Sequence, residues 1–221
     1  MTQHLVASGA PVIAIELDPP LVRRLGDLAA QHPNLTIVAA DVLTVDLSQL
    51  AAGRRIRIYG NLPYYITSPI LHHFFEFASL IDEIHIVIQA EVAFRLAARP
   101  GTRDYGYLSV LTQYFSSPRI ALKLPPSAFR PPPKVGSALV SMKLPGDSAK
   151  LNVANSAEFM DFVKLCFSQK RKTLVNNLRS IAEPETVRGA LNSIKKKPES
   201  RAEELSVVQL ANLFGSLTGK V

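Results

Sequence analysis

The chain has 221 residues, 47% hydrophobic and 19% charged, a composition that excludes a disordered protein and indicates one large domain or a medium domain with a small one. Its single cysteine, Cys166, excludes a disulfide framework and a cysteine-based zinc site, and it indicates a reducing compartment, so we expect a cytoplasmic protein. No apolar run is long enough for a membrane helix and no secretion signal is recognised, so we expect no membrane partner.

Positive charge is unevenly distributed along the sequence. The formal net charge is +7 and the isoelectric point is about 9.6, yet residues 1–60 carry no net charge. The excess therefore lies in the second two-thirds of the chain. An excess of basic residues is typical of proteins with an anionic partner, most commonly nucleic acid. A basic protein without such a partner fits equally well.

In chain order, the first half alternates β-branched runs with helical patterns. Strands are predicted at Val12–Glu16, Leu35–Ala39, residues 55–59 and residues 84–88. Helices are predicted after Asp18-Pro19-Pro20, at residues 67–77, at residues 91–98 and at Tyr107–Phe115. An antiparallel pair is predicted at residues 119–124 and 137–144, separated by a proline-rich segment.

This alternation predicts an α/β fold with a mostly parallel sheet covered on both faces. In such sheets ligands bind beyond the carboxyl ends of the strands. Because Glu16, Asp41 and Asn61 each stand at or just past a predicted strand end, we expect one edge of the sheet to collect all three. Beyond residue 147 only helical periodicity remains, which predicts two domains, residues 1–147 and residues 148–221.

The two acidic residues at strand ends are candidates for binding a nucleoside. A carboxylate offers two acceptors at the separation of two ribose hydroxyls, which suits Glu16. Asp41 can accept a hydrogen bond from an adenine amino group. Each has an ordinary alternative, a solvent-facing acid for Glu16 and an N-cap or turn for Asp41.

The segment Gly60-Asn61-Leu62-Pro63-Tyr64-Tyr65 follows a predicted strand and precedes a predicted helix. Pro63 fixes its own φ and biases Leu62 towards an extended conformation, which turns the Asn61 side-chain oxygen and a nearby backbone carbonyl towards one point. Tyr64 adds an aromatic face beside them. Two acceptors and a stacking plane suit an exocyclic amine on a planar base, whose nitrogen lone pair can then attack an electrophile. An ordinary proline turn with an exposed tyrosine is the alternative.

The motif Asn61-Leu62-Pro63-Tyr64 resembles the (N/D/S)-(I/P/L)-P-(Y/F) signature of amino-group methyltransferases that use S-adenosylmethionine. The whole chain resembles the ribosomal RNA adenine dimethylases, which transfer two methyls to N6 of each of two adjacent adenines near the 3′ end of small-subunit rRNA. The resembling segments are residues 12–18, 40–43, 60–68, 89–95, 105–110, 125–137 and 167–178. They cover nearly the whole chain in the family's order.

The resemblance implies a fold and a function for each of the two predicted domains. Residues 1–147 would form a Rossmann-like methyltransferase domain, and residues 148–221 a small helical RNA-binding domain. Glu16 would bind the ribose of S-adenosylmethionine, and Asp41 with Val42 would bind its adenine.

The resemblance also assigns the residues around the target base. Asn61, which would also lie near the cofactor, and the Leu62 carbonyl would accept hydrogen bonds from the target amine, with Pro63 shaping the turn. Tyr64 and Phe129 would stack on the two faces of a base flipped out of the RNA, at about 1–3 kcal/mol per base.

Six residues are candidates for RNA binding by the same resemblance. They are Lys134, Lys170, Arg171, Lys172, Asn176 and Asn177. The run Lys195-Lys196-Lys197 is interpreted instead as a solvated face. The expected partner is small-subunit rRNA or the assembling small subunit, bound by a monomer.

We expect no metal and no acid–base pair, because the sulfonium of S-adenosylmethionine is already activated and the protein mainly supplies alignment. His72 and His73 are neighbours on a predicted helix and point in different directions, so they make a poor metal site. His85 in a strand and Cys166 on an apolar helical stretch are interpreted as core or partner-facing residues.

One departure from the family pattern lies at the N-terminus. Enzymes of this class begin with a strand and a glycine-rich loop that holds the methionine part of the cofactor, and the chain begins with residues that resemble those just after that loop. We therefore expect a sheet without its first, central strand, with two exposed strand edges. We also expect this chain to bind the cofactor weakly or not at all, whereas a longer parent is active.

Three other functions remain open at this point. A non-catalytic RNA-binding or ribosome-assembly factor fits the missing loop. A methylase of large-subunit rRNA that confers antibiotic resistance fits the motif, although residues 125–137 and the basic segment fit small-subunit enzymes better. A nicotinamide-dependent oxidoreductase would explain Glu16 but gives Asn61-Leu62-Pro63-Tyr64 no role.

Overall fold

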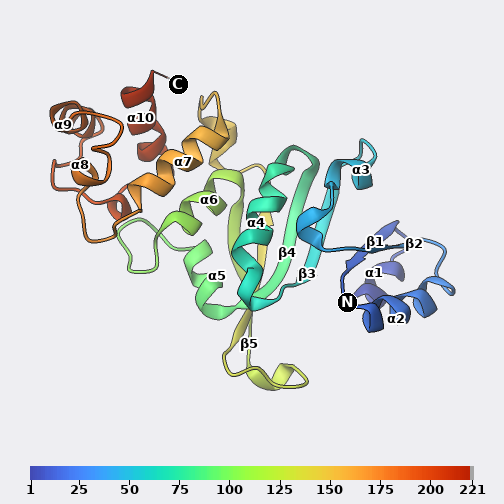
Figure 1. The fold of residues 1–221 in the computed structure, drawn as a ribbon. Helices are drawn as coiled ribbons and strands as arrows, with labels where there is room; N and C mark the ends of the chain where they lie inside the picture. The colour runs from blue at the N-terminus through green and yellow to red at the C-terminus, as the bar shows by residue number, and fades with distance from the viewer. Residues whose placement is uncertain (220–221) are drawn as a thin grey trace. The chain divides into compact units, whose positions relative to one another are not determined.

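The computed structural model describes residues 1–219, which divide into two compact units (Figure 1). The first unit comprises Met1–Arg55 and Pro69–Leu80, and the second comprises Ile56–Ser68 and Ile81–Val221. The boundary falls inside helix α4 (Thr67–Glu76). Each unit is described by itself.

The first unit contains a two-stranded parallel sheet. Its elements are α1 (Thr2–Val6), β1 (Val12–Glu16), α2 (Pro19–Ala29), β2 (Leu35–Ala39), a 3-10 helix (Val42–Thr44) and α3 (Leu47–Ala51). Strand β1 pairs with β2 so that Glu16 lies opposite Ala39. Helix α2 begins with prolines in its first turn and packs against both strands. The carboxyl ends of the two strands therefore share one edge of this sheet.

The second unit contains a four-stranded mixed sheet in the order β3-β4-β6-β5. Its strands are β3 (Ile56–Asn61), β4 (Ile81–Gln89), β5 (Ser117–Leu124) and β6 (Ser137–Lys143). Strand β4 runs parallel to β3 and antiparallel to β6. Helices α5 (Ala90–Leu96) and α6 (Tyr107–Phe115) pack on it, over strand residues such as Ile86 and Val140 that are fully buried.

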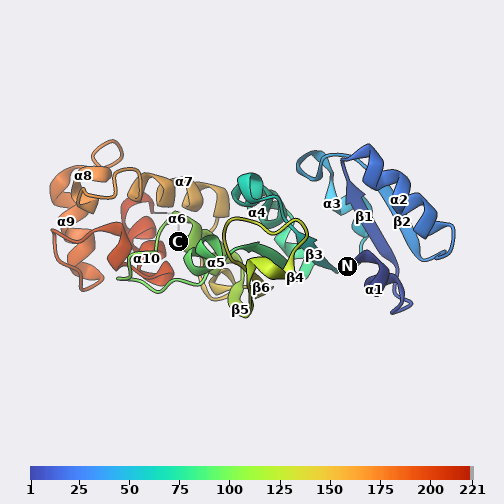
Figure 2. The ribbon, with the colours of Figure 1, turned by 90° about the horizontal axis from the view of Figure 1, so that it is seen from below.

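The remainder of the second unit is helical. Its α-helices are α7 (Ser156–Cys166), α8 (Leu174–Asn177), α9 (Pro184–Ser193) and α10 (Val207–Thr218). An aromatic cluster joins α7 and α10 to α6, because the rings of Tyr114 and Phe159 lie 5.1 Å apart and those of Phe159 and Phe214 lie 5.6 Å apart. Figures 1 and 2 show α7–α10 gathered on the α6 side of the sheet.

The strands form two sheets rather than one continuous sheet. Within the described residues β1 pairs only with β2, and β3 pairs only with β4, so no hydrogen-bonded ladder connects the two sheets. The interruption agrees with the expected absence of a central strand, and β1 and β3 are both edge strands. Glu16 therefore ends a strand of the first sheet, and Asn61 ends a strand of the second.

The other elements follow the predictions closely. All six predicted strands are present, and the last two pair antiparallel as expected. Helix α3, with five residues, was not predicted. No helix in residues 1–219 is long and apolar enough to span a bilayer.

Candidate functional site

The carboxyl edge of the β1–β2 sheet carries two half-buried carboxylates. Glu16 Oε1 accepts hydrogen bonds of 2.9 Å from the backbone N–H groups of Leu17 and Asp18. Asp41 Oδ1 accepts one of 2.9 Å from Leu43 N, so Asp41 is the N-cap of the 3-10 helix that begins at Val42. The second oxygen of each carboxylate has no hydrogen-bond partner among the described residues, which leaves it available to a ligand.

The turn after β3 leaves two hydrogen-bond acceptors available. The Leu62 N–H donates to Val87 O at 3.1 Å, which keeps the turn beside β4. Pro63 has φ −58° and ψ 131°, as its ring requires. Neither the Asn61 side chain nor the Leu62 carbonyl has a hydrogen-bond partner in the described part of the chain. Both groups are therefore available as hydrogen-bond acceptors at this turn.

Tyr64 is anchored at its hydroxyl, which lies 2.7 Å from Ser137 Oγ. Ser137 is the first residue of β6 and is almost completely buried. On the other side of the turn, the buried Thr67 hydroxyl donates to Pro63 O at 3.3 Å. These contacts restrict the orientation of the Tyr64 ring.

Phe129 lies in the loop that connects β5 to β6. It follows a 3-10 helix (Pro126–Ala128), donates its N–H to Pro126 O at 3.1 Å and is half-buried. The loop returns to the sheet where Ala90 N donates to Gly136 O at 2.9 Å, immediately before Ser137. The segment that carries Phe129 therefore ends at the residue that binds Tyr64.

Lys170, Arg171 and Lys172 occupy the loop between α7 and α8 and are exposed. The Lys170 ammonium group donates to the backbone carbonyl of Arg103 at 3.0 Å, which joins this basic loop to the α5–α6 loop. Asn177 points into the protein, where Nδ2 donates to Cys166 O at 2.6 Å and to Gln169 O at 3.3 Å. These two hydrogen bonds hold the basic loop against the protein interior. The buried Oδ1 of Asn177 has no hydrogen-bond partner among the described residues.

The remaining candidates for RNA binding, and the lysine run at residues 195–197, differ in their surroundings. Lys134 is exposed in the same loop as Phe129. Asn176 is exposed and donates to Thr173 Oγ1 at 3.1 Å. In the lysine run at residues 195–197, Lys196 Nζ donates to Glu204 O at 2.5 Å, which gives that lysine a structural contact.

The histidines form ordinary packing and hydrogen-bond contacts. His73 Nε2 lies 2.9 Å from Val45 O. His85 stacks on Tyr59 at 5.0 Å and lies 3.0 Å from Glu83 Oε2, a hydrogen bond that holds the pKa of Glu83 below its usual value. No group of three metal-ligating side chains occurs within residues 1–219. Cys166 is fully buried, and burial raises the pKa of its thiol, as expected for a core residue.

The candidate residues fall into the two units as three groups. The first unit holds Glu16, Asp41 and Val42, and the second holds the turn at Asn61–Tyr64 with Phe129 and, separately, the basic loop. Sequence analysis missed Ser137, although it ends the proline-rich motif and begins a predicted strand. It also missed Arg103, whose contribution is a backbone carbonyl and carries no residue-type signal.

Comparison with known proteins gives a consistent result. Residues 1–218 match the family described as Ribosomal RNA adenine dimethylase. A protein from Acidobacterium capsulatum named ribosomal RNA small subunit methyltransferase A is 43% identical over 98% of this chain and 77% of its own length. A protein of the same name from Xanthomonas oryzae pv. oryzae is 40% identical over 96% of this chain and 80% of its own.

Solved structures of the same fold are also known. The crystal structure of a dimethyladenosine transferase from Plasmodium falciparum has a TM-score of 0.76 at 22% identity, over 96% of this chain and 83% of that one. The crystal structure of the 23S rRNA methyltransferase ErmE has a TM-score of 0.67 at 27% identity, over 93% of this chain and 81% of that one. The Rossmann-like methyltransferase fold is therefore shared, and the chain is a member of the ribosomal RNA adenine dimethylase family.

Proposed function

We propose that this protein transfers methyl groups from S-adenosylmethionine to N6 of two adjacent adenines near the 3′ end of small-subunit rRNA. The observation that carries the proposal is the turn after β3, where the Asn61 side chain and the Leu62 carbonyl are both free to accept hydrogen bonds. An adenine amino group has two N–H donors, one for each acceptor. Holding both protons directs the nitrogen lone pair out of the ring plane and towards the methyl donor.

The residues of the first unit fit the nucleoside part of the cofactor. Glu16 and Asp41 each keep one carboxylate oxygen without a partner among the described residues, at neighbouring ends of two paired strands. Glu16 binds the ribose hydroxyls and Asp41, with Val42, binds the adenine. When bound, S-adenosylmethionine supplies an activated methyl group, so the protein needs to align the amine rather than ionise it.

The aromatic residues of the second unit hold the target base. Tyr64 stacks on one face of the flipped adenine and Phe129 covers the other, which offsets part of the cost of unstacking. The contact of the Tyr64 hydroxyl with Ser137 supports this role, because a ring with a fixed orientation is a better stacking platform. Lys134 is exposed in the same loop as Phe129 and binds the neighbouring phosphates.

The basic loop supplies sequence-independent affinity for RNA. Lys170, Arg171 and Lys172 are exposed and neutralise phosphates, with the exposed Asn176 beside them. The buried amide of Asn177 supports the loop rather than contacting RNA itself. The protein acts as a monomer in the cytoplasm on the assembling small subunit.

Replacing Asn61 tests this function. Asn61→Ala removes one acceptor for the target amine and leaves the phosphate-binding residues in place. We expect methyl incorporation into unmethylated small subunits to fall at least about a hundredfold, while the affinity for the same RNA changes less than about twofold. Asn192→Ala, on the exposed side of α9, is the matched control. Unchanged methyl incorporation by Asn61→Ala would contradict the proposal.

The expected weak cofactor binding stays a prediction. A calorimetric titration with S-adenosylmethionine measures it, with Glu16→Ala as the variant that removes the ribose contact. Tight binding that survives in Glu16→Ala would contradict both the expectation and the assignment of Glu16.

A methylase of large-subunit rRNA is the second candidate, favoured by the shared fold with the 23S rRNA methyltransferase. Identity to that enzyme is 27%, against 43% to a protein named as a small-subunit methyltransferase, which supports the small-subunit substrate. A non-catalytic RNA-binding protein is less well supported, because it gives the two free acceptors beside β4 no role. The oxidoreductase alternative gives that turn no role either.

A further inference from the structure

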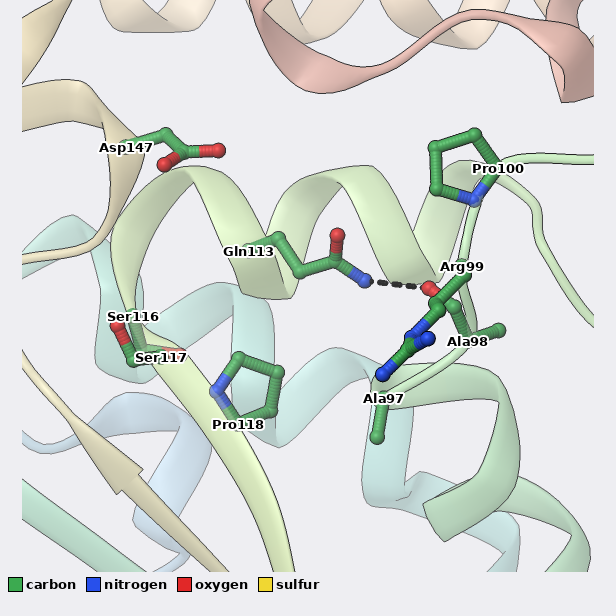
Figure 3. Close-up of a pocket in the computed structure, with 9 residues that line it drawn as sticks. All are labelled: Ala97, Ala98, Arg99, Pro100, Gln113, Ser116, Ser117, Pro118 and Asp147. Carbon is green, nitrogen blue, oxygen red and sulfur yellow. Dashed lines mark hydrogen bonds between the residues drawn. The ribbon is translucent and has the colours of Figure 1, made fainter.

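A cavity of about 310 Å³ lies in the second unit, and none of its lining residues has a role in the proposed function (Figure 3). It is bounded by the α5–α6 loop, the end of α6, the start of β5 and the 3-10 helix that begins at Asp147. Its volume is at the lower end of the range of about 300–1,000 Å³ found for small-molecule sites, which suits a single nucleobase better than a dinucleotide.

The polar groups of the cavity are predominantly acceptors. Gln113 Nε2 donates to Ala98 O at 2.8 Å and to Leu96 O at 3.3 Å, so its two N–H groups are used and its Oε1 remains an acceptor. Figure 3 shows Oε1 turned away from Ala98. The half-buried Asp147 carboxylate has no hydrogen bond or ion pair within the described chain. A ligand that fills this cavity should therefore present several N–H donors.

The cavity also contains the charged Arg99 donor, beside the Ser117 hydroxyl, and an apolar lining. The Arg99 guanidinium is exposed and pairs with no described residue, including the oppositely charged Asp147. The rings of Pro100 and Pro118 stand on opposite sides of the Gln113 side chain (Figure 3). Apolar ring faces of this kind provide contact for a planar group without competing for its hydrogen bonds.

Among the RNA bases, guanine matches this set of groups best. Its N1–H and N2 amine are adjacent donors that a carboxylate can accept together, and its O6 and N7 are the acceptors that arginine binds. Adenine and cytosine offer a single exocyclic amine, and uracil a single N–H. We propose that this cavity binds an unstacked guanine of the RNA substrate, with Asp147 and Gln113 accepting from its N–H groups and Arg99 donating to its acceptor edge. The inference rests on the proposed function for the identity of the RNA.

The position of the cavity in the second unit supports an RNA ligand. The α5–α6 loop that supplies Arg99 also supplies the Arg103 carbonyl, to which Lys170 donates at 3.0 Å. The same loop is held at Gly101, whose N–H donates to Glu203 O at 2.7 Å. Phosphates bound at the basic loop therefore lie next to the loop that lines the cavity, so one strand can reach both.

Nuclear magnetic resonance of the 15N-labelled protein tests the inference with mononucleotides. Guanosine monophosphate should shift the backbone amide signals of residues 97–99 and 113–117 saturably. Inosine monophosphate lacks the N2 amine and should bind at least about fivefold more weakly, and adenosine monophosphate should leave these signals in place. Shifts that are absent with the guanine nucleotide, or equal for all three nucleotides, would overturn the proposal.

Two pairs of variants make the test specific. Asp147→Asn replaces one acceptor oxygen by a donor and should weaken guanosine monophosphate binding about tenfold or more, whereas Asp161→Asn, at an exposed position of α7, should not. Arg99→Gln alters an exposed side chain, so it keeps the fold and should weaken binding, with Arg119→Gln on β5 as its control. Wild-type affinity in both Asp147→Asn and Arg99→Gln would overturn the proposal.

Experiments with substrate RNA distinguish a failure of this inference from a failure of the proposed function. Asp147→Asn should lower the affinity for substrate RNA and raise KM for methylation while kcat at saturating RNA is unchanged. If wild-type protein methylates the rRNA and guanosine monophosphate does not bind, the guanine site alone is wrong. If guanosine monophosphate binds and no rRNA is methylated, the proposed function is wrong.

Discussion

The Tyr64 hydroxyl lies 2.7 Å from Ser137 Oγ, and this contact joins the turn after β3 to the first residue of β6. The two residues are far apart in the sequence, but β4 separates β3 from β6 in the sheet and brings their ends close together. Ser137 also ends the loop that carries Phe129. One hydrogen bond therefore links the two segments that hold the aromatic residues proposed to enclose the target base.

Removing this hydrogen bond should weaken base stacking without unfolding the protein. We expect Ser137→Ala and Tyr64→Phe each to reduce methylation about three- to tenfold, as the loss of one hydrogen bond allows. The double variant should lose no more than either single one, because both remove the same interaction. Fluorescence quenching of 2-aminopurine in place of the target adenine reports stacking directly and should fall in parallel.

Ser141→Ala is the matched control, since Ser141 lies on the same strand and has no hydrogen-bonding side-chain partner in the described chain. Additive losses in the double variant, or unchanged quenching in Ser137→Ala, would show that the contact does not position Tyr64.

Gly146 should not tolerate a side chain. A Cβ there would lie 2.4 Å from both Gln113 O and Ser116 N, which are backbone atoms that cannot move aside without disturbing α6. We expect Gly146→Ala to lower the free energy of unfolding by at least ~2 kcal/mol, measured by chemical denaturation. Gly189→Ala in α9 meets no atom within 4 Å and should raise stability by about 0.5–1 kcal/mol. Equal effects at the two positions would contradict this account.

Cys166 should be unreactive in the folded protein. Its side chain is fully buried, and burial raises the pKa of the thiol, which suppresses the thiolate that reacts with electrophiles. We expect alkylation by iodoacetamide at neutral pH to be at least about a hundredfold slower in the native than in the denatured protein. Labelling of the native protein at the denatured rate would show that α7 opens readily or is packed differently.

Asn177 should affect RNA binding through the basic loop it supports. Asn177→Ala leaves Cys166 O without its donor and removes one of the two hydrogen bonds to Gln169 O, which keeps the Lys172 N–H. We therefore expect a stability loss of about 1–3 kcal/mol and a several-fold lower RNA affinity. Asn192→Ala provides the control for both measurements. If Asn177→Ala is measurably destabilised but binds RNA with unchanged affinity, the Asn177 amide is not needed for RNA binding by the basic loop.

Local patterns in the sequence were enough to predict most of the fold. Short apolar runs, β-branched in the first four cases, predicted all six strands, and the proline positions marked the start of α2 and the turn at Pro63. Helix α3 has only five residues, which is too short for its periodicity to be recognised. The sequence predicted that a central strand is missing but not that the remaining strands form two separate sheets. Strand pairing depends on contacts between distant residues, which local patterns do not encode.

The candidate site was predicted in its residue types but not in all its contacts. The motif at residues 61–64 predicted two acceptors for an amine. In the structure neither the Asn61 side chain nor the Leu62 carbonyl has a partner among the described residues, and their role stays a prediction. Asn177 was expected to contact RNA, yet its amide is used inside the protein, and only burial distinguishes it from the exposed Asn176. Ser137 has no distinctive sequence signal beyond its place at the end of a motif.

The most direct test of the central claim maps the methylated nucleosides. Ribosomal subunits without this modification are incubated with the protein and cofactor in large excess, and both rRNAs are then analysed by mass spectrometry. We predict N6,N6-dimethyladenine at two adjacent positions near the 3′ end of small-subunit rRNA, and none with Asn61→Ala. Methylation of large-subunit rRNA instead, or no methylated adenine from folded wild-type protein, would contradict the account.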